Sequence, residues 1–157
     1  LQESDRTAYF DMMSNPNVMS SIPREIMSKD ESDQHLTKFI NTYGHQVGPK
    51  VWAIESKSEK EFIGLCAFLK NNNDEDEIGY RLREKYWGVG YGTEVTRGLI
   101  DFGFNHLETD LITADVYVDN FRSVKILEKF FKKDIEFFNA EDNCVDRRYK
   151  LTRKEWL

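Results

Sequence analysis

The sequence predicts an α/β or α+β fold with one central, mixed β-sheet. The expected elements run in the order helices, β-hairpin, strand–turn–helix and strand–helix–strands. The chain has 157 residues, which suits a single domain over 1–157 with a core large enough to fold alone. Apolar residues make up 39% and charged residues 32%, which is ordinary for a soluble globular protein.

The N-terminal part predicts two helices with an irregular segment between them. The first helix covers about 4–14 and ends before Asn15, because a residue that precedes proline avoids helical geometry. A turn or short irregular helix is expected over 15–23. Ser28 and Glu31 then have the spacing of a capping box and predict the start of a helix that Gly44 closes. Its apolar face consists of Leu36, Phe39, Ile40 and Tyr43.

Three strands are expected next. Residues 51–55 and 61–69 are apolar and flank a polar turn, so they predict a hairpin. After an acidic loop over 71–76, apolar and other residues alternate over 77–83, as in a third strand. On this alternation, we expect Tyr80 to fill the core.

The C-terminal half predicts two helices and three strands. The helices are expected at about 93–106 and 121–131, with a strand over 111–118 between them. From Ile135 onward the chain predicts two short strands, the second near 147–151.

Composition argues against several functional classes. The net charge of −6 argues against nucleic acid as the main partner. No apolar run approaches the roughly 20 residues of a membrane span, and no secretory signal is visible. Cys66 and Cys144 lie far apart, which leaves a disulfide open but suggests no secreted framework, so a cytoplasmic setting is expected. No spacing of His, Cys and Asp suggests a metal site.

The most informative segment lies between the third strand and the helix that follows. It is Trp87-Gly88-Val89-Gly90-Tyr91-Gly92-Thr93-Glu94. Glycines let the backbone approach a ligand, and amides at a helix N-terminus bind anions. The segment is not a Walker loop and fits the dinucleotide fingerprint poorly. We therefore expect a pyrophosphate held by consecutive amides, without lysine or magnesium.

This glycine turn resembles the acyl-CoA-binding motif Q/R-x-x-G-x-G/A of the GCN5-related N-acetyltransferase (GNAT) superfamily. Trp87 stands where the motif has Gln or Arg, as in the RimJ/RimL-like branch. Further segments that resemble this branch are 3–5, 14–19, 78–82, 86–94, 118–123, 127–129 and 149–156. One departure is Phe130-Phe131-Lys132-Lys133, where the family has Gly-Phe after the last helix.

The resemblance implies a GNAT fold, with a mostly antiparallel mixed sheet that splays between 77–83 and 111–118 and is flanked by helices. It also implies acetyl-CoA as cosubstrate, no metal, and a family strand before Leu1 that this chain lacks. The implied cofactor contacts are Leu82 and Arg83 for pantetheine, and Asn120 with Ser123 for the pantetheine arm. In the glycine turn, the amides of Val89, Gly90, Tyr91, Gly92 and Thr93 would hold the pyrophosphate, and Trp87 and Gly88 are further implied cofactor-binding residues.

Glu77 is the candidate general base, because many family members place a carboxylate at the start of the splayed strand. The alternative is a solvated acid in the run 74–77. The family's usual tyrosine acid is absent, since Leu127 occupies its position. Ser123 and Tyr117 are the candidate catalytic acids, although a thiolate can also leave unaided.

The implied activity is acetyl transfer from acetyl-CoA to a primary amine by direct attack in a ternary complex. The acceptor is a protein N-terminus or a small amine, and the enzyme is a monomer or homodimer with no membrane partner. The alternative is a non-catalytic acyl-CoA-binding or interaction module of the same fold. A nucleotide-binding domain is a third, weaker reading.

Overall fold

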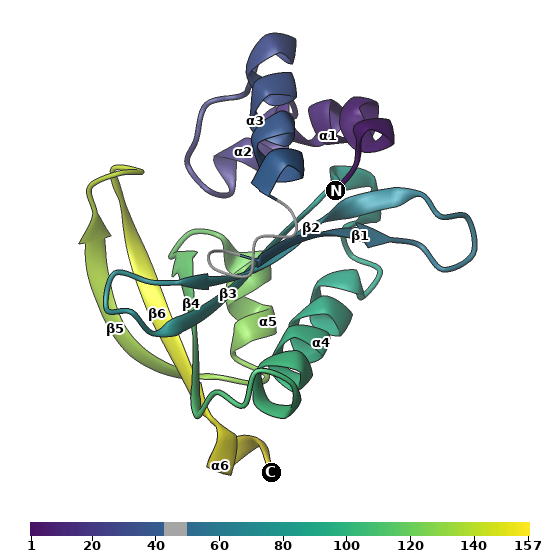
Figure 1. Cartoon of the computed structure of the whole chain (residues 1–157). Helices are drawn as coiled ribbons and strands as arrows, with labels where there is room; N and C mark the ends of the chain where they lie inside the picture. Colours follow the sequence, from purple (N-terminus) through teal and green to yellow (C-terminus); the bar gives the residue numbers. More distant parts are fainter. Residues whose placement is uncertain (43–49) are drawn as a thin grey trace.

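The computed structural model describes residues 1–42 and 50–157. It has one six-stranded sheet with the strand order β1-β2-β3-β4-β6-β5 and helices on both faces (Figure 1). The predicted fold class is thus confirmed: a mixed α/β arrangement around one central sheet. The expected closure of a helix at Gly44 falls outside the described residues.

In the described part of the chain, four of the five strand pairings are antiparallel. β1 (Lys50–Glu55), β2 (Phe62–Lys70) and β3 (Asp76–Leu82) form a meander, which confirms the predicted hairpin. On the other side, β4 (Leu111–Tyr117) pairs with β6 (Cys144–Thr152), and β6 pairs with β5 (Lys132–Asn139).

The two halves of the sheet meet at β3 and β4, which run parallel. Their register has one residue pair, Glu77 with Thr113. From that point the strands diverge, as the splayed sheet of the prediction requires. We call this divergence the fork.

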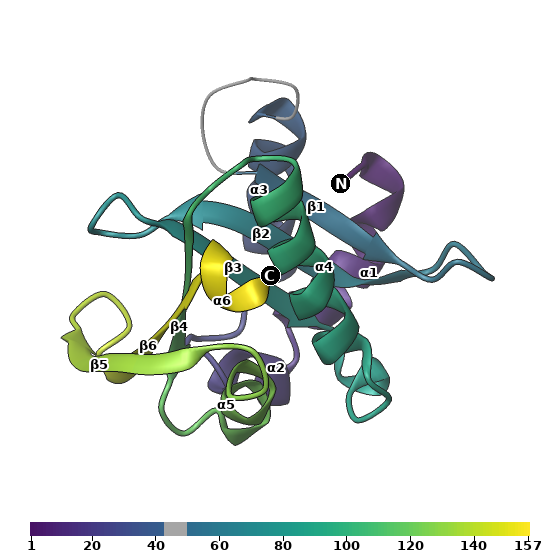
Figure 2. The same cartoon turned by 90° about the horizontal axis from the view of Figure 1, so that it is seen from below.

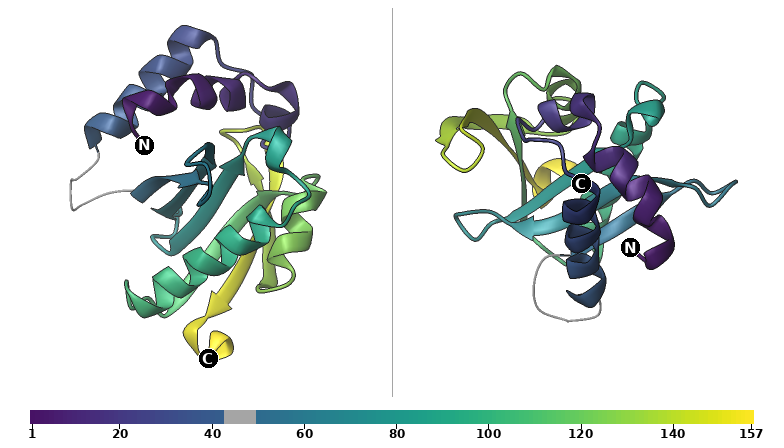
Figure 3. Two further views of the ribbon diagram at one scale, coloured as in Figure 1. Left: turned by 90° about the vertical axis from the view of Figure 1, so that its right-hand side faces the viewer. Right: turned by 90° about the horizontal axis from the view of Figure 1, so that it is seen from above.

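Helices cover both faces of the sheet (Figures 1 and 3). On one face lie the short η1 (Glu3–Asp5), α1 (Arg6–Met13), α2 (Pro16–Ser20) and α3 (Lys29–Thr42). They bury a core of side chains that includes Tyr9, Met12, Met13, Val18, Met19, Leu36 and Phe62. Burying a side chain of this size contributes about 1.5–3 kcal/mol to folding.

The opposite face is covered by α4 (Tyr91–Asn105) and α5 (Phe121–Leu127), as Figure 2 shows from below. The larger core lies there and includes Phe68, Ile78, Leu99, Ile100, Phe104, Ile112 and Tyr149. Two short elements complete the chain: η2 (Glu84–Tyr86) follows β3, and α6 (Arg153–Trp156) follows β6.

Local capping explains where the first helices begin. The Asn15 side chain accepts hydrogen bonds from the amides of Asn17 and Val18, and Pro16 occupies the first helical position. The predicted capping box is present: the Ser28 amide donates to Glu31 at 2.7 Å, and the Glu31 amide donates to Ser28 Oγ at 3.3 Å.

Two predicted boundaries on the C-terminal side were wrong. The helix expected over 121–131 ends at Leu127, and β5 begins at Lys132, before the expected Ile135. The amides of Phe130 and Phe131 both donate to the Leu127 carbonyl, so the chain turns there without a glycine. Phe131 is buried in the core, and its packing fixes this turn.

Three further observations bear on the composition arguments. Both cysteines are free, so the disulfide that the sequence left open does not form. Within residues 1–42 and 50–157, no helix has the length and apolar character needed to cross a membrane. No cluster of three His, Cys, Asp or Glu side chains in these ranges has an arrangement that could hold a metal ion.

Candidate active site

Two adjoining cavities open at the fork. The larger has a volume of about 450 Å³ and lies between the glycine turn, β3 and α5. The smaller, of about 210 Å³, lies between β3, β4, β6 and the segment 21–24. They share Ser21, Ile22, Tyr80, Arg81, Asn120 and Ser123. The fork therefore holds two cavities of different size, and these six shared residues form the wall between them.

The glycine turn borders the larger cavity and leaves amides free at the start of α4. Gly88 and Gly90 have φ values of 78° and 99°, which side-chain-bearing residues rarely adopt. The Glu94 amide donates to the Gly90 carbonyl at 3.1 Å, and no side chain caps this end. The amides of 91–93 precede that first helical bond, so they lack an intrahelical acceptor. They are suited to an anion.

Gly92 also makes room for the cavity wall. A Cβ atom at this position would lie 2.8 Å from Ile126 Cδ1 and 2.9 Å from the Tyr80 hydroxyl. Only glycine therefore lets α4, α5 and the Tyr80 ring approach one another this closely. Gly92, the third glycine of the motif, is therefore required by close packing, whereas Gly88 and Gly90 are required by their positive φ values.

Three cations line the same cavity: Arg122 and Lys125 on α5, and Lys129 in the turn that follows it. Lys129 Nζ donates to Thr93 Oγ1 at 3.3 Å, and the Arg122 guanidinium lies 4.8 Å from the centre of the Trp87 ring. Sequence reasoning missed these residues. The available signal was their spacing of three and four positions, which is the spacing of one helix face within the helix expected over 121–131.

The edge of β3 at the fork exposes main-chain groups of alternate residues. The Arg83 amide donates to the Ile63 carbonyl of β2 at 2.9 Å. In an antiparallel ladder the bonded residues alternate, so Tyr80 and Leu82 direct their main-chain groups away from β2, into the fork. The Leu82 carbonyl accepts from Trp87 Nε1 at 3.0 Å, which ties the glycine turn to the strand.

Arg83 is placed differently from what the resemblance implied. Its amide belongs to the pairing with β2, and its carbonyl accepts from the Tyr86 amide. Its side chain donates to Asp11 at 2.8 Å and to the Phe62 carbonyl at 3.0 Å. The main-chain groups of Arg83 are thus bonded within the protein, whereas those of Tyr80 face the fork.

Asn120, Ser123 and Tyr80 meet on the wall between the cavities. Asn120 caps α5 by accepting from the Ser123 amide at 3.3 Å, which leaves its amide nitrogen as a donor. The expectation that Tyr80 fills the core was wrong, since its ring lines both cavities. Burial raises the pKa of Tyr80, while the nearby Ser123 and Thr96 side chains lower it.

Glu77 lies where β3 and β4 touch. Burial, with the neighbouring Asp115 carboxylate as the next cause, raises the pKa of Glu77 to about 7, against the effect of Arg148. Its half-buried side chain differs from a solvated strand-end acid such as the exposed Asp74. Glu77 does not itself line either cavity. Asp115, whose carboxylate neighbours Glu77, does line the smaller one.

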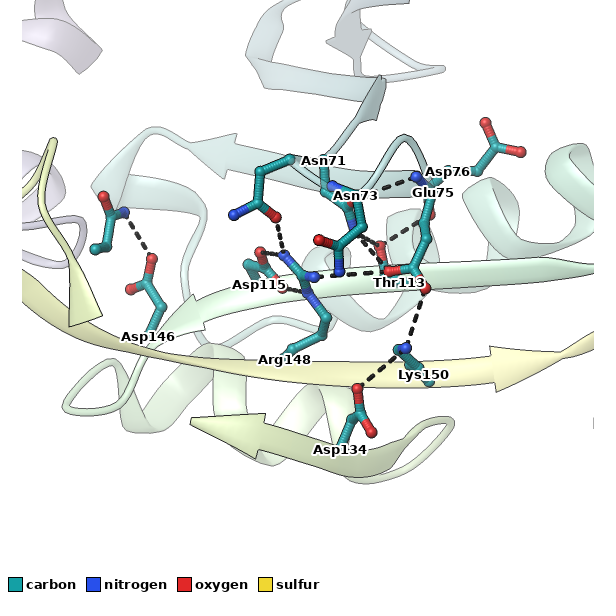
Figure 4. A network of polar contacts seen from close by, with 12 residues as sticks. Asn71, Asn73, Glu75, Asp76, Thr113, Asp115, Asp134, Asp146, Arg148 and Lys150 are labelled. Atoms are coloured by element: carbon teal, nitrogen blue, oxygen red, sulfur yellow. Dashed lines mark hydrogen bonds and ion pairs between the residues drawn. The ribbon is translucent and has the colours of Figure 1, made fainter. Parts of the chain in front are cut away.

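Asp115 is held by a network of charged side chains that joins four strands and the loop before β3 (Figure 4). Arg148 donates from Nε and Nη2 to the two Asp115 oxygens at 2.8 and 2.7 Å, and from Nη2 to Asn72 at 3.0 Å. Lys150 Nζ lies 3.0 Å from Glu75 and 3.1 Å from Asp134. The alternation of residues along each strand does not predict these pairs, because they depend on the register between β4 and β6.

Tyr117 borders only the smaller cavity. Its hydroxyl donates to Asp119 at 2.9 Å, and that carboxylate raises the pKa of Tyr117. Ser123, in contrast, borders both cavities. The structure thus brings Ser123 together with Asn120 and Tyr80 at both cavities, whereas Tyr117 lines the smaller cavity alone.

The comparison with known proteins agrees with this geometry. The family described as "Acetyltransferase (GNAT) domain" matches residues 1–130. The chain belongs to this family. It is 37% identical over 128 residues to the uncharacterized N-acetyltransferase p20 of Bacillus licheniformis, covering 77% of this chain and 72% of that protein. It is also 30% identical to the uncharacterized N-acetyltransferase YoaA of Bacillus subtilis, over 85% of this chain and 77% of the relative.

Solved structures show the same GNAT fold. An acetyltransferase of the GNAT family from Bacillus anthracis has a TM-score of 0.84 at 20% identity, covering 99% of this chain and 93% of its own. Spermidine N-acetyltransferase from Vibrio cholerae, in complex with CoA and spermine, has a TM-score of 0.79 at 21% identity, with 99% and 94% covered. Given the family, this GNAT domain is an acyltransferase enzyme.

Proposed function

We propose that this GNAT domain transfers the acetyl group of acetyl-CoA to a primary amine by direct attack in a ternary complex. The observation that carries the proposal is the fork itself. It joins a cavity lined by free amides and cations to a smaller cavity lined by Asp115, the carboxylate beside Glu77. Both substrates can therefore meet at the shared wall.

In this proposal the larger cavity binds the coenzyme. The pyrophosphate lies on the amides of the turn from Val89 through Thr93, and the cations Arg122, Lys125 and Lys129 in and just after α5 offset phosphate charge. The pantetheine arm follows the free edge of β3 and bonds main-chain groups of Tyr80 and Leu82, as an added strand does. Asn120 donates to a pantetheine carbonyl.

The chemical step needs a base, an acid and a stabilised oxyanion. The acceptor ammonium loses a proton to Glu77, directly or through Asp115 and water. The amine nitrogen forms a bond to the acetyl carbon while the carbon–sulfur bond breaks. The coenzyme thiolate then takes a proton from Tyr80, Ser123 or Tyr117, the hydroxyl groups beside the cavities, and the second proton lost by the amine nitrogen restores that hydroxyl. With its pKa near 7, Glu77 is suited to accept a proton at neutral pH.

The acceptor class and the branch are finer proposals. The glycine turn with Trp87 supports the RimJ/RimL-like branch, whose acceptors include protein N-termini. Small amines are supported by the spermidine N-acetyltransferase named above. They are also supported by a 27% identical relative, FsC-acetyl coenzyme A-N(2)-transacetylase of Aspergillus fumigatus. We further propose a single domain over 1–157 and, because both cysteines are free, a cytoplasmic setting.

A thiol-release assay tests the activity. Acetyl-CoA is incubated with a panel of polyamines, amino acids and N-terminal peptides, and free CoA thiol is measured. Glu77→Gln should lower kcat by about 100-fold or more while acetyl-CoA affinity stays within twofold. The matched control is Asp74→Asn, an exposed acid at φ 60°, which asparagine tolerates.

The competing possibility is a domain that binds acyl-CoA without catalysis. Leu127 at the position of the usual family tyrosine favours it. Tight acetyl-CoA binding with no thiol release for any acceptor would establish that alternative. Equal turnover in wild type and Glu77→Gln would instead keep the activity and reject Glu77 as the base.

A further inference from the structure

Arg81 brings an unpaired charge to the wall between the two cavities. Its Nη1 lies 3.0 Å from Met13 Sδ and 3.9 Å from Met19 Sδ, and both sulfurs are weak acceptors. Its Nε is buried without a hydrogen-bond partner. Among the described residues, no carboxylate lies within 4.0 Å of this guanidinium. Residues 43–49 include no Asp or Glu that could supply one.

This arrangement is costly for the free protein. Burial lowers the pKa of Arg81 to about 10, so the group still carries its charge at neutral pH. A buried charge is stable only when it is paired and hydrogen-bonded. An anion that enters through the cavities bordered by Arg81 would supply the missing partner.

Asp146 brings the opposite charge to the smaller cavity. The residue is 8% exposed, and its carboxylate accepts from two neutral groups, Asn139 Nδ2 at 2.8 Å and Cys144 Sγ at 3.4 Å. In the described part of the chain it forms no ion pair within 4.0 Å. Lys and Arg are also missing from the sequence of residues 43–49.

The other charges that line the smaller cavity are matched within the protein. Arg24 Nε lies 2.6 Å from Asp142, and Asp115 is bonded to Arg148. The two groups for which the described residues supply no ion pair come from opposite sides of the fork, Arg81 from β3 and Asp146 from β6. A ligand that satisfies both must carry both signs of charge.

We propose that the acceptor is a small amino acid, whose carboxylate binds Arg81 and whose ammonium lies on the side of Asp146 before it is acetylated. The inference rests on the proposed function and narrows its acceptor class. A volume of about 210 Å³ suits a small molecule. A polyamine has no anion for Arg81, and a protein N-terminus has no free carboxylate next to its amine.

The test compares matched acceptors. The twenty amino acids are assayed for thiol release with acetyl-CoA. The best of them is then compared with its carboxamide and with the amine that lacks the carboxylate. Wild type should use the amino acid with a kcat/KM about 10- to 100-fold above that of the amide, the range expected for one charged hydrogen-bonded pair. Arg81→Gln should remove most of this preference and Arg81→Lys should restore part of it.

Arg97→Gln is the control, because Arg97 is an exposed arginine on α4 outside both cavities. Each variant is checked for thermal stability and acetyl-CoA binding, so that a misfolded protein is not counted. Amino acid binding to the CoA complex is measured by calorimetry in parallel. Binding that depends on Arg81 without any turnover supports this inference and rejects the proposed activity.

Two results would overturn the inference while leaving the proposed activity intact. One is a wild-type enzyme that acetylates the amide or the decarboxylated amine at least as well as the amino acid. The other is an equal loss of kcat/KM for all three acceptors in a folded Arg81→Gln variant. If no amino acid binds and no acceptor is acetylated, both proposals fail.

Discussion

Glu77 pairs with Thr113, and within residues 1–42 and 50–157 this is the one register pair that joins β3 to β4. The contact is reinforced by Thr113 Oγ1, which donates to the Asp76 carbonyl at 2.9 Å and accepts from Asn71 Nδ2 at 3.2 Å. The vertex of the fork is therefore fixed by several bonds. The Glu77 backbone is thus held where the two strands begin to diverge.

The ionisation of Glu77 should set the pH dependence of the reaction. Since the pKa of Glu77 is raised to about 7, kcat/KM should rise about tenfold per pH unit below 7 and level off above it. Glu77→Gln should flatten this limb. The measurement is kcat/KM for thiol release between pH 5.5 and 9. A wild-type profile without an inflection near 7 would exclude Glu77 as the titrating base.

The raised pKa of Glu77 also predicts that ionisation of this side chain lowers the stability of the fold. The folded-state pKa of about 7 lies above the ordinary value of 4.5, so the unfolded state releases this proton first as pH rises. Glu77 should therefore lower the free energy of unfolding progressively from about pH 4.5 to pH 7. At pH 8, Glu77→Gln should be more stable than wild type by about 1–3 kcal/mol, and at pH 4 the difference should vanish. Urea unfolding of wild type and Glu77→Gln at pH 8 and at pH 4 measures the difference in stability at each pH.

The glycines of α4 offer a matched pair of substitutions. Gly92→Ala should lower stability by about 1–3 kcal/mol and raise the KM for acetyl-CoA, because its Cβ would press on Ile126 and the Tyr80 hydroxyl. Gly98→Ala adds its Cβ to open space on the same helix and should stabilise by about 0.5–1 kcal/mol. Thermal unfolding and initial rates check the pair. Equal behaviour of the two variants would contradict the packing role of Gly92.

The hydroxyl that protonates the thiolate can be identified by three conservative variants. Tyr80→Phe should lower kcat by about 10- to 100-fold with little change in KM, since Tyr80 borders both cavities. Ser123→Ala should have a smaller effect. Tyr117→Phe should stay within about twofold, because its hydroxyl donates to Asp119. A loss confined to Tyr117→Phe would instead assign the acid to the smaller cavity.

Much of the fold could be predicted because its signals are local. The apolar alternation over 77–83, the capping box at Ser28 and the glycine turn each depend on neighbours within a few positions. The fork was expected only from the family resemblance, since parallel contact between β3 and β4 involves segments far apart in sequence. The early end of α5 was missed because it depends on the burial of Phe131 in the tertiary core.

The candidate site, too, could be predicted where its signals are local and not where it depends on contacts between distant segments. The amides of 91–93 and the cap at Asn120 follow from local sequence, and the structure places both at the cavities. The pairing of Asp115 with Arg148 could not be predicted, because it needs the register of β4 on β6. The unpaired state of Arg81 is likewise a property of the packed structure. Alternation predicts the face of a side chain but not its partner.

The Asp115–Arg148 pair should contribute to stability and to the state of the base. Arg148 is 2% exposed and holds both Asp115 oxygens, so Arg148→Met would leave a buried carboxylate unpaired and should lower the free energy of unfolding by about 3–5 kcal/mol. Its neighbour Arg147 pairs with the partly exposed Glu136, and Arg147→Met should cost only about 0–1 kcal/mol. Urea unfolding of both variants measures the difference.

A second readout separates a positioning role from a purely structural one. Arg148 lowers the pKa of Glu77, so its removal should shift the inflection of the kcat/KM profile above 7. Arg148→Lys keeps the charge but cannot bond both Asp115 oxygens in the same fork geometry. Compared with Arg148→Met, the Arg148→Lys variant should restore the wild-type inflection of the pH profile more fully than it restores the free energy of unfolding. An unchanged profile in a folded Arg148→Met protein would show that the network supports the sheet without acting on Glu77.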